Sequence, residues 1–267
     1  MDALQRSIDQ NSVLWLLVAG VVGAGFKLLF DTYLAERLSR RATEAMAVRE
    51  LSNPLLQATG RVGSRLSTYL TYGDWRWYSE SAYFRTSLLY TVGVYLHWFD
   101  RVDTEAFLNA SPRSSRARRL REPLYLTSKV LSGRDFVGPV PDGWPHGLPE
   151  ILKFDQIAMG EAVASGGTEP LVLRYIDFVR GLDSDADLAR WFAPLSSLMA
   201  VAEDDGDPRR DMARRRIRCF ALALLALESH LGGEPLDRTV LGAHLEALDA
   251  RTRAVMTQEL RDHGVEV

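Results

Sequence analysis

The stretch SESAYFRTSLLYTVGVYLHWFDR, residues 79–101, decides the fold. Wound at 3.6 residues per turn, it carries apolar or aromatic side chains on nearly every side. A helix that is apolar all round belongs in the interior of a protein or in a membrane. We therefore expect residues 79–101 to form a helix at the centre of a helical domain.

Helical periodicity also appears on both sides of this stretch. It covers residues 31–53, 55–72, 149–164, 168–181, 185–202, 208–231 and 237–261. Asn53-Pro54 predicts a helix end because proline disfavours helix at the preceding residue. Gly181 predicts a second end, and Asp207 followed by Pro208 predicts a start. Residues 133–147 are rich in proline and glycine and predict an irregular loop. No segment alternates like a strand, so the sequence predicts an all-α fold.

A second apolar run, SVLWLLVAGVVGAGFKLLF at residues 12–30, carries Lys27 as its only charge. A helix of about 18 residues spans ~27 Å, close to the ~30 Å hydrocarbon core of a bilayer. Trp15 and Tyr33 flank the run, where aromatic rings favour the headgroup region. We predict a transmembrane helix at residues 13–30.

Two alternatives to this anchor are a buried helix of a soluble core and a cleaved signal peptide. A signal peptide needs a basic start and a small-residue cleavage motif. The first eleven residues hold Arg6 against Asp2 and Asp9, and no such motif follows the apolar run. The sequence therefore favours an uncleaved anchor.

The basic residues around the anchor predict its direction. Arg37, Arg40, Arg41 and Arg49 follow the apolar run, whereas only Arg6 precedes it. Because cytoplasmic flanks carry the excess of basic residues, the N-terminus is expected outside and the remainder inside. The expected chain is a single-pass protein of the cell membrane. Its parts are a short extracytoplasmic N-terminus at 1–12, the transmembrane helix at 13–30, a helical stalk at 31–53 and a cytoplasmic multi-helix bundle at 54–267.

Small residues on one face of the anchor indicate a packing surface. Gly20, Gly23 and Ala24 lie on neighbouring positions, and small residues four apart let two membrane helices approach closely. We expect this face to support a homo-oligomer, in addition to the contact of the segment with the lipid bilayer.

The most basic stretch lies in PRSSRARRLRE, residues 112–122. Its basic residues are Arg113, Arg116, Arg118, Arg119 and Arg121. They are candidates for contact with phosphate, above all in anionic lipid headgroups. The aromatic residues that single-strand binders interleave are missing from the run, so nucleic acid is not the expected partner. A solvated surface paired with nearby acids remains the alternative.

We expect no metal and no cofactor. The acidic stretch EDDGDPRRD, residues 203–211, lacks the spacing of a calcium loop, and helix capping accounts for Asp207 and Asp211. No histidine has a second histidine or cysteine at metal-ligand spacing. Cys219 lies in an apolar run, where burial raises a thiol pKa, and His97 is expected in the core.

Glu161 stands in an otherwise apolar pattern. We expect it to be buried and paired with Arg85 or Arg174, because a buried carboxylate needs a cation or several donors.

One spacing resembles a catalytic signature. Arg238 and His244, in RTVLGAH, are similar to the Arg-x4–6-His pattern of HEPN-type ribonucleases, which are helical. The resemblance implies that His244 acts as acid and base while Arg238 stabilises a charged phosphorane. Thr239 stands where that family often has a polar residue after the arginine.

Two longer segments also resemble known proteins. SAYFRTSLLYTVGVYLHWFD (81–100) and FDQIAMGEAV (154–163) are similar to stretches of uncharacterised bacterial proteins with a Ser-x-Leu-Tyr aromatic helix and a later Ile-Gly-Glu motif. The second segment reads Ala-Met-Gly-Glu at 158–161, a partial match. The resemblance implies a bacterial, membrane-linked helical protein without an assigned activity.

Two classes of function follow. The favoured one is a membrane-tethered interaction or regulatory module with no evident catalytic site and with an unknown cytoplasmic protein as partner. The alternative is an enzyme at the membrane surface, in its sharpest form a ribonuclease that uses Arg238 and His244. A formal net charge of −3 gives no overall attraction to nucleic acid.

Overall fold

The computed structural model describes residues 22, 23, 27, 30, 33, 39, 50–72, 75–106, 115–138, 147, 150–164, 172–232 and 237–267. Of residues 105, 106 and 115–120 it describes the backbone alone. The chain divides into two compact units, residues 1–47 and 48–267. Most of the expected membrane helix at 13–30 lies outside the described residues. Among the residues described, none belongs to a helix with both the length and the apolar character needed to cross a bilayer.

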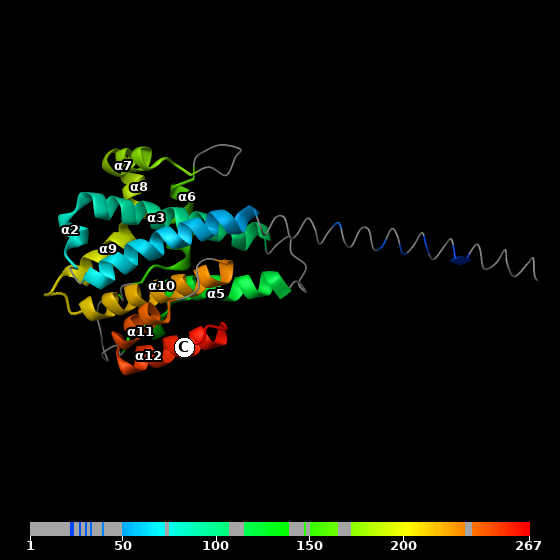
Figure 1. Cartoon of the computed structure of the whole chain (residues 1–267). Helices are drawn as coiled ribbons and strands as arrows, with labels where there is room; N and C mark the ends of the chain where they lie inside the picture. Colours follow the sequence, from blue (N-terminus) through cyan, green and yellow to red (C-terminus); the bar gives the residue numbers. More distant parts are fainter. Residues whose placement is uncertain are drawn as a thin grey trace, which may run out of the picture. The chain divides into compact units, whose positions relative to one another are not determined.

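Helices account for all the regular structure of the described residues of the second unit (Figure 1). Residues 50–72 form the first helix. The others are α2 (Trp77–Glu80), α3 (Ala82–Arg101) with a π-helical turn (Val102–Ala106), α5 (Ser115–Ser132) with a 3-10 turn (Arg134–Phe136), α6 (Lys153–Ala162), α7 (Tyr175–Ser184), α8 (Ala186–Trp191), α9 (Ala193–Glu203), α10 (Arg210–Leu231), α11 (Arg238–Glu246) and α12 (Ala250–Asp262). One isolated bridge joins Ala164 to Val172. The all-α prediction is confirmed for the described chain.

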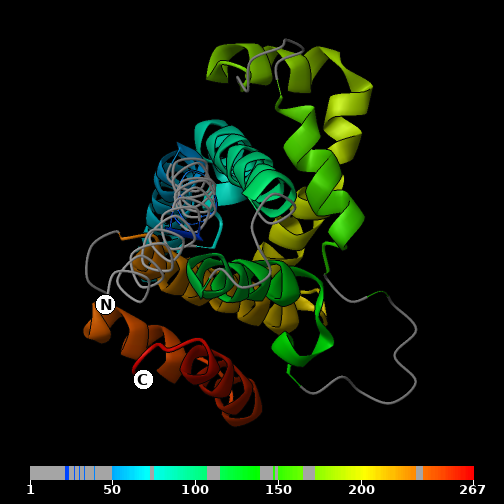
Figure 2. The same cartoon turned by 90° about the vertical axis from the view of Figure 1, so that its right-hand side faces the viewer.

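Four long helices form the centre of the unit: residues 50–72, α3, α5 and α10. Figure 2 looks nearly along them, with α6–α9 on one side and α11 and α12 on the other. Tyr69 stacks on Phe84 at 5.2 Å between ring centroids, so the first helix runs antiparallel to α3. The arrangement is a helical bundle with two flanking layers.

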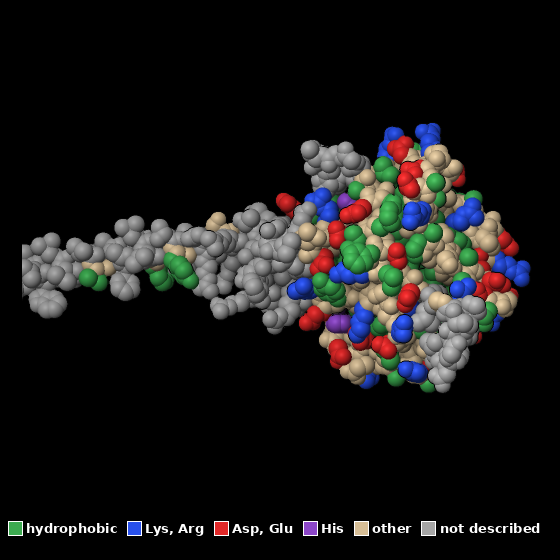
Figure 3. All heavy atoms as spheres, turned by 180° about the vertical axis from the view of Figure 1, so that it is seen from behind, with side chains coloured by type: hydrophobic (Ala, Val, Ile, Leu, Met, Phe, Trp, Pro, Cys, Tyr) green, Lys and Arg blue, Asp and Glu red, His purple; other side chains and the backbone are tan. Residues whose placement is uncertain are grey.

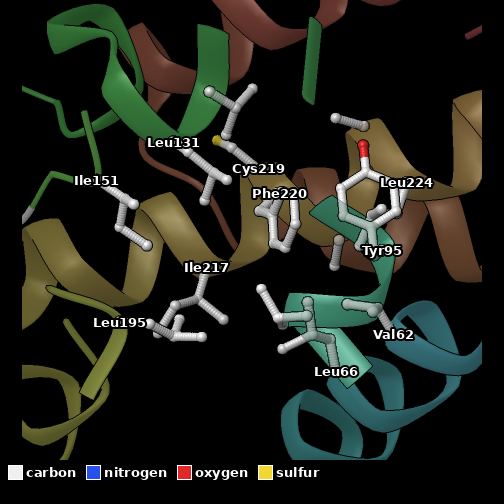
Figure 4. Packing of buried hydrophobic residues seen from close by; sticks show 14 of the residues in the cluster. Val62, Leu66, Tyr95, Leu131, Ile151, Leu195, Ile217, Cys219, Phe220 and Leu224 are labelled. Carbon is white, nitrogen blue, oxygen red and sulfur yellow. The ribbon is translucent and has the colours of Figure 1, made fainter. Parts of the chain in front are cut away.

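The expected helix at 79–101 is divided at Ser81, which caps α3, while residues 79 and 80 belong to α2. Helix α3 is central, as its sequence predicts. Every residue from Val92 to His97 in α3 is buried, which is more than a full turn. Cys219 to Leu224 in α10 are buried in the same way, so α10 is a second central helix. The two meet at Tyr95 and Phe220, whose ring centroids lie 6.1 Å apart (Figure 4).

Close packing of α6 on α3 depends on a glycine. A Cβ atom at Gly160 would lie 2.9 Å from the backbone of Leu96 and His97. The absence of a side chain at Gly160 therefore lets the two helices approach until backbone touches backbone.

Several helix boundaries differ from the prediction, among them the start of α7, which lies at Tyr175 and not at residue 168. The helix over residues 50–72 continues through Pro54, where we expected an end. Proline removes one hydrogen bond, but Leu55 and Val62 beyond it are fully buried, and this packing holds the helix together. Gly181 lies inside α7, which continues to Ser184. Asp207 accepts a bond from the Arg209 amide at 2.7 Å, so it closes a turn, and α10 begins at Arg210.

Two further expected helices are each divided, and one long helix was not predicted. The segment at 185–202 breaks at Phe192, and α9 begins after it at Ala193, with Pro194 in its first turn. The segment at 237–261 breaks before Asp249, whose side chain accepts bonds from the amides of Arg251 and Thr252 and starts α12. The unpredicted helix is α5, which contains Pro123.

Candidate functional site

An open pocket of about 510 Å³ lies between α11, α12 and the residues that follow α12. Its apolar side chains are Leu241, Leu245, Val265 and Val267, and its charged side chains are Arg238, Arg261 and Glu266. Gly264 adopts a positive φ of 77°, which brings the Val265 amide to the Leu260 carbonyl at 2.9 Å. This left-handed turn ends α12 and buries the Val265 side chain, so it shapes the pocket wall.

The two arginines of the pocket are bound to the tail of the chain. Arg238 hydrogen-bonds the carboxylate of Glu266, and Arg261 donates to the Val267 carbonyl at 3.4 Å. The side chains of Arg238 and Glu266 are 75% and 82% exposed, so water screens their attraction. The pocket is therefore a shallow surface feature whose charges are already matched.

Helix α11 does not bring Arg238 and His244 to one open site. Six residues of helix separate them by ~9 Å along the axis and about 120° around it. Arg238 faces solvent, whereas His244 is only 7% exposed. Burial, followed by the charge of Arg218, lowers the pKa of His244. The catalytic pairing of Arg238 with His244 stays a prediction, and this geometry gives it no shared opening.

Two arginines of α10 share one aromatic ring. Arg218 and Arg214 lie one turn apart on α10, and both cover the ring of Trp75. Their Cζ atoms are 4.7 Å (Arg214) and 5.8 Å (Arg218) from the ring centroid. The i, i+4 spacing of the two arginines is visible in the sequence, but nothing there shows that they share Trp75.

The arginine run can be placed only in part. Arg113 lies outside the described residues, and Arg116, Arg118 and Arg119 fall where only the backbone of α5 is described. Arg121 is exposed, and its Nη2 lies 3.5 Å from the Tyr125 hydroxyl.

Tyr125 connects Arg121 to a second cation. Its hydroxyl donates to Asp103 Oδ1 at 2.8 Å. Lys153 Nζ lies 3.9 Å from Asp103 Oδ2 and 5.2 Å from the centroid of the Tyr125 ring. Leu152 and Phe154, on either side of Lys153, are 52% and 85% exposed. The sequence did not single out this combination of two cations with two exposed apolar side chains, and we call it the Phe154 patch.

The acidic stretch at 203–211 serves structure. Glu203 accepts from the amides of Tyr78 and Ser79 at 2.6 and 2.8 Å. Asp205 pairs with Arg210 at 2.9 Å, and Asp207 pairs with Arg209 at 2.7 Å. Among the residues that the structure describes, no group of three or more acidic, histidine or cysteine side chains is placed to hold a metal ion.

Three residues were expected to be buried in the core, and the structure places two of them there. Glu161 is exposed, so the expected buried ion pair is wrong. Gln156, Met159 and Gly160 form the buried face of α6, and Glu161 is turned away from it. His97 is buried, as expected. Cys219 is fully buried, and burial raises its pKa to about 12, as its apolar surroundings predict.

Basic and acidic side chains alternate on the face in Figure 3, and no large area of one sign stands out there. Of the expected packing face of the membrane helix, only Gly23 is described, and Gly20 and Ala24 lie outside the described residues. No protein-family model, curated protein or solved structure matches the chain.

Proposed function

We propose that this chain is a membrane-tethered module that acts by binding at the cytoplasmic face of the cell membrane and not by catalysis. The apolar run at 13–30 and the basic residues after it support the tether and its direction. Self-association through Gly20, Gly23 and Ala24 is part of the proposal. The resemblance to bacterial membrane-linked helical proteins agrees with it.

The observation that carries the binding function is the Phe154 patch. Phe154 is 85% exposed, and its ring loses contact with water when it enters the boundary between headgroups and acyl chains. Lys153 and Arg121 lie close enough to pair with anionic headgroups at the same time, each contributing ~1 kcal/mol. The arginine run begins just before Arg121 and adds charge of the same sign. We therefore propose anionic lipid as the first partner of the module.

The tether makes a weak surface interaction effective. A domain held next to the bilayer by its own chain meets headgroups at a high effective concentration, so modest affinity is sufficient. A cytoplasmic protein that binds the same patch is the competing partner.

Deletion of residues 1–30 tests the anchor. The full chain should resist alkaline-carbonate extraction and pellet with membranes, and the deletion variant should stay in the supernatant. A deletion variant that still resists extraction would show that another segment holds the protein in the membrane.

Liposome co-sedimentation tests the lipid contact. Residues 48–267 contain all the buried core residues that the structure describes, from Leu55 onward, and suit this assay. We expect binding to vesicles that contain phosphatidylserine, and weaker binding by Phe154→Ser and by Lys153→Glu. Ile176→Ser, which changes an exposed apolar residue on α7, is the matched control and should bind as the parent does. Equal binding by all variants at low salt would leave the protein partner as the better proposal.

A further inference from the structure

An acidic residue lies among the cations of the Phe154 patch. Asp103 belongs to the π-helical turn that follows α3. Its Oδ1 accepts from the Tyr125 hydroxyl at 2.8 Å, and its Oδ2 lies 3.9 Å from Lys153 Nζ. Lys153 and Arg121 both lie over the ring of this tyrosine, 5.2 and 5.3 Å from its centroid. A carboxylate and two cations therefore gather around one aromatic ring.

The ion pair between Asp103 and Lys153 is not closed. Their separation of 3.9 Å is longer than the roughly 3.2 Å limit of an N–H···O hydrogen bond. The ammonium therefore keeps its three donors for other acceptors, and Oδ2 accepts no hydrogen bond from the described residues. The Lys153 side chain is 51% exposed and the Asp103 side chain 19%, so solvent reaches both. The pair presents a donor group and an acceptor, side by side, to a third molecule.

A second carboxylate increases the negative charge at this place. Asp100 lies three residues before Asp103, and burial and then the charge of Asp103 raise its pKa. The charges of His97 and Lys153 act on Asp100 in the opposite direction. Two acids here therefore oppose two cations, Lys153 and Arg121. A headgroup with negative charge alone is repelled by the acids, whereas a headgroup that also carries a cation matches both signs.

We propose, building on the lipid contact described above, that Asp103 binds the primary ammonium of an aminophospholipid while Lys153 binds the phosphate of the same headgroup. Phosphatidylserine and phosphatidylethanolamine both join an ammonium to the phosphate through a short carbon spacer, so one headgroup can reach both residues. Phosphatidylglycerol has the phosphate without the amine. The trimethylated nitrogen of phosphatidylcholine has no N–H to donate to a carboxylate.

The test uses the full chain in lipid nanodiscs and measures how far the headgroups protect Lys153. A brief pulse of an acetylating reagent modifies exposed lysines. Mass spectrometry gives the extent at Lys153 relative to Lys129, which lies on α5 and pairs with Glu259. The discs contain phosphatidylcholine with the same fraction of phosphatidylserine or phosphatidylglycerol, so their charge is equal. We expect Lys153 to be about 3- to 10-fold better protected in the phosphatidylserine discs.

Three variants assign the preference to Asp103. Asp103→Asn should remove the difference between the two lipids, because an amide lacks the charge that pairs with an ammonium. Tyr125→Phe removes the hydroxyl that donates to Asp103 but keeps the carboxylate, and it should keep the preference. Asp183→Asn, at an exposed position on α7, is the matched control and should behave as the parent does.

A further set of discs distinguishes the two aminophospholipids. Phosphatidylethanolamine replaces part of the phosphatidylcholine in discs that contain phosphatidylglycerol. A gain in the protection of Lys153 shows that the ammonium and the phosphate are sufficient. A gain with phosphatidylserine alone identifies that lipid as the ligand.

The outcomes separate headgroup recognition from the lipid contact itself. Equal protection by phosphatidylserine and phosphatidylglycerol, or a preference that survives in Asp103→Asn, would overturn the recognition of the amine and leave the lipid contact in place. Loss of the preference in Tyr125→Phe would overturn the direct role of Asp103. No protection of Lys153 by any anionic disc would overturn both proposals.

Discussion

The guanidinium of Arg216 donates from Nη2 to the carbonyl oxygen of Gly133 at 2.9 Å. Its Nη1 also bonds the carbonyls of Val130 and Leu131, so one buried side chain of α10 satisfies the C-terminal end of α5. A helix C-terminus carries partial negative charge, which favours a cation there. Burial lowers the pKa of Arg216 to about 10, so the group still carries its charge near neutral pH.

Replacement of Arg216 by methionine should destabilise the domain strongly. The change leaves buried carbonyl oxygens at the end of α5 without donors, and we expect a loss of about 3 kcal/mol or more in the free energy of unfolding. Urea denaturation of residues 48–267 measures it. Arg251→Met, at an exposed position in the first turn of α12, is the control and should leave the midpoint unchanged. Equal midpoints for the two variants would contradict the capping role of Arg216.

Two glycines should respond to alanine with opposite signs. Gly160→Ala places a methyl group 2.9 Å from the backbone of α3, and we expect a loss of about 1–3 kcal/mol from overpacking. Gly242→Ala meets no atom within 4 Å in the middle of α11, where alanine favours helix by up to ~1 kcal/mol. Thermal unfolding of both variants gives the comparison. A stable Gly160→Ala protein would mean that α6 can move away from α3 at little cost.

Glu203 should hold the short helix α2 in place. Its carboxylate accepts from the Tyr78 and Ser79 amides, which are donors that a helix start leaves unmatched. Glu203→Gln keeps the shape but loses the charge and one acceptor, and we expect a loss of about 1–2 kcal/mol. Glu161→Gln, exposed on α6, is the matched control. Hydrogen exchange at the Tyr78 and Ser79 amides should increase only in the Glu203 variant.

Cys219 should make stability depend on alkaline pH. Its folded thiol keeps the proton up to a pKa of about 12, whereas an unfolded thiol titrates near 9.0. The folded state therefore binds more protons in this window, and the free energy of unfolding falls as the pH rises from 9 towards 12. Cys219→Ala should make this slope smaller, whatever its effect at neutral pH.

A thiol reagent provides an independent check on Cys219. At pH 8 the folded chain should not react, and urea should restore the reaction, because the side chain is fully buried. Rapid labelling without denaturant would show that the core opens at this position.

The sequence alone determined the features that depend on local periodicity. A helix repeats every 3.6 residues, so an apolar ring such as that of residues 79–101 indicates both helix and burial without any knowledge of partners. The burial of Cys219 followed from its apolar run in the same way. The all-α class was therefore predictable, and so were the approximate positions of most helices.

Tertiary structure decided whatever depends on how helices meet. Pro54 stays inside a helix because residues beyond it pack into the core, and Glu161 is exposed because Gly160 turns the other face of α6 to α3. Arg216 meets α5 from more than eighty positions away, and Arg218 and Trp75 are far apart in sequence. Such contacts follow from the crossing of whole helices, which a local pattern does not encode. The fold class was therefore predictable from the sequence, whereas the contacts of Arg216 and Arg218 are known only from the tertiary structure.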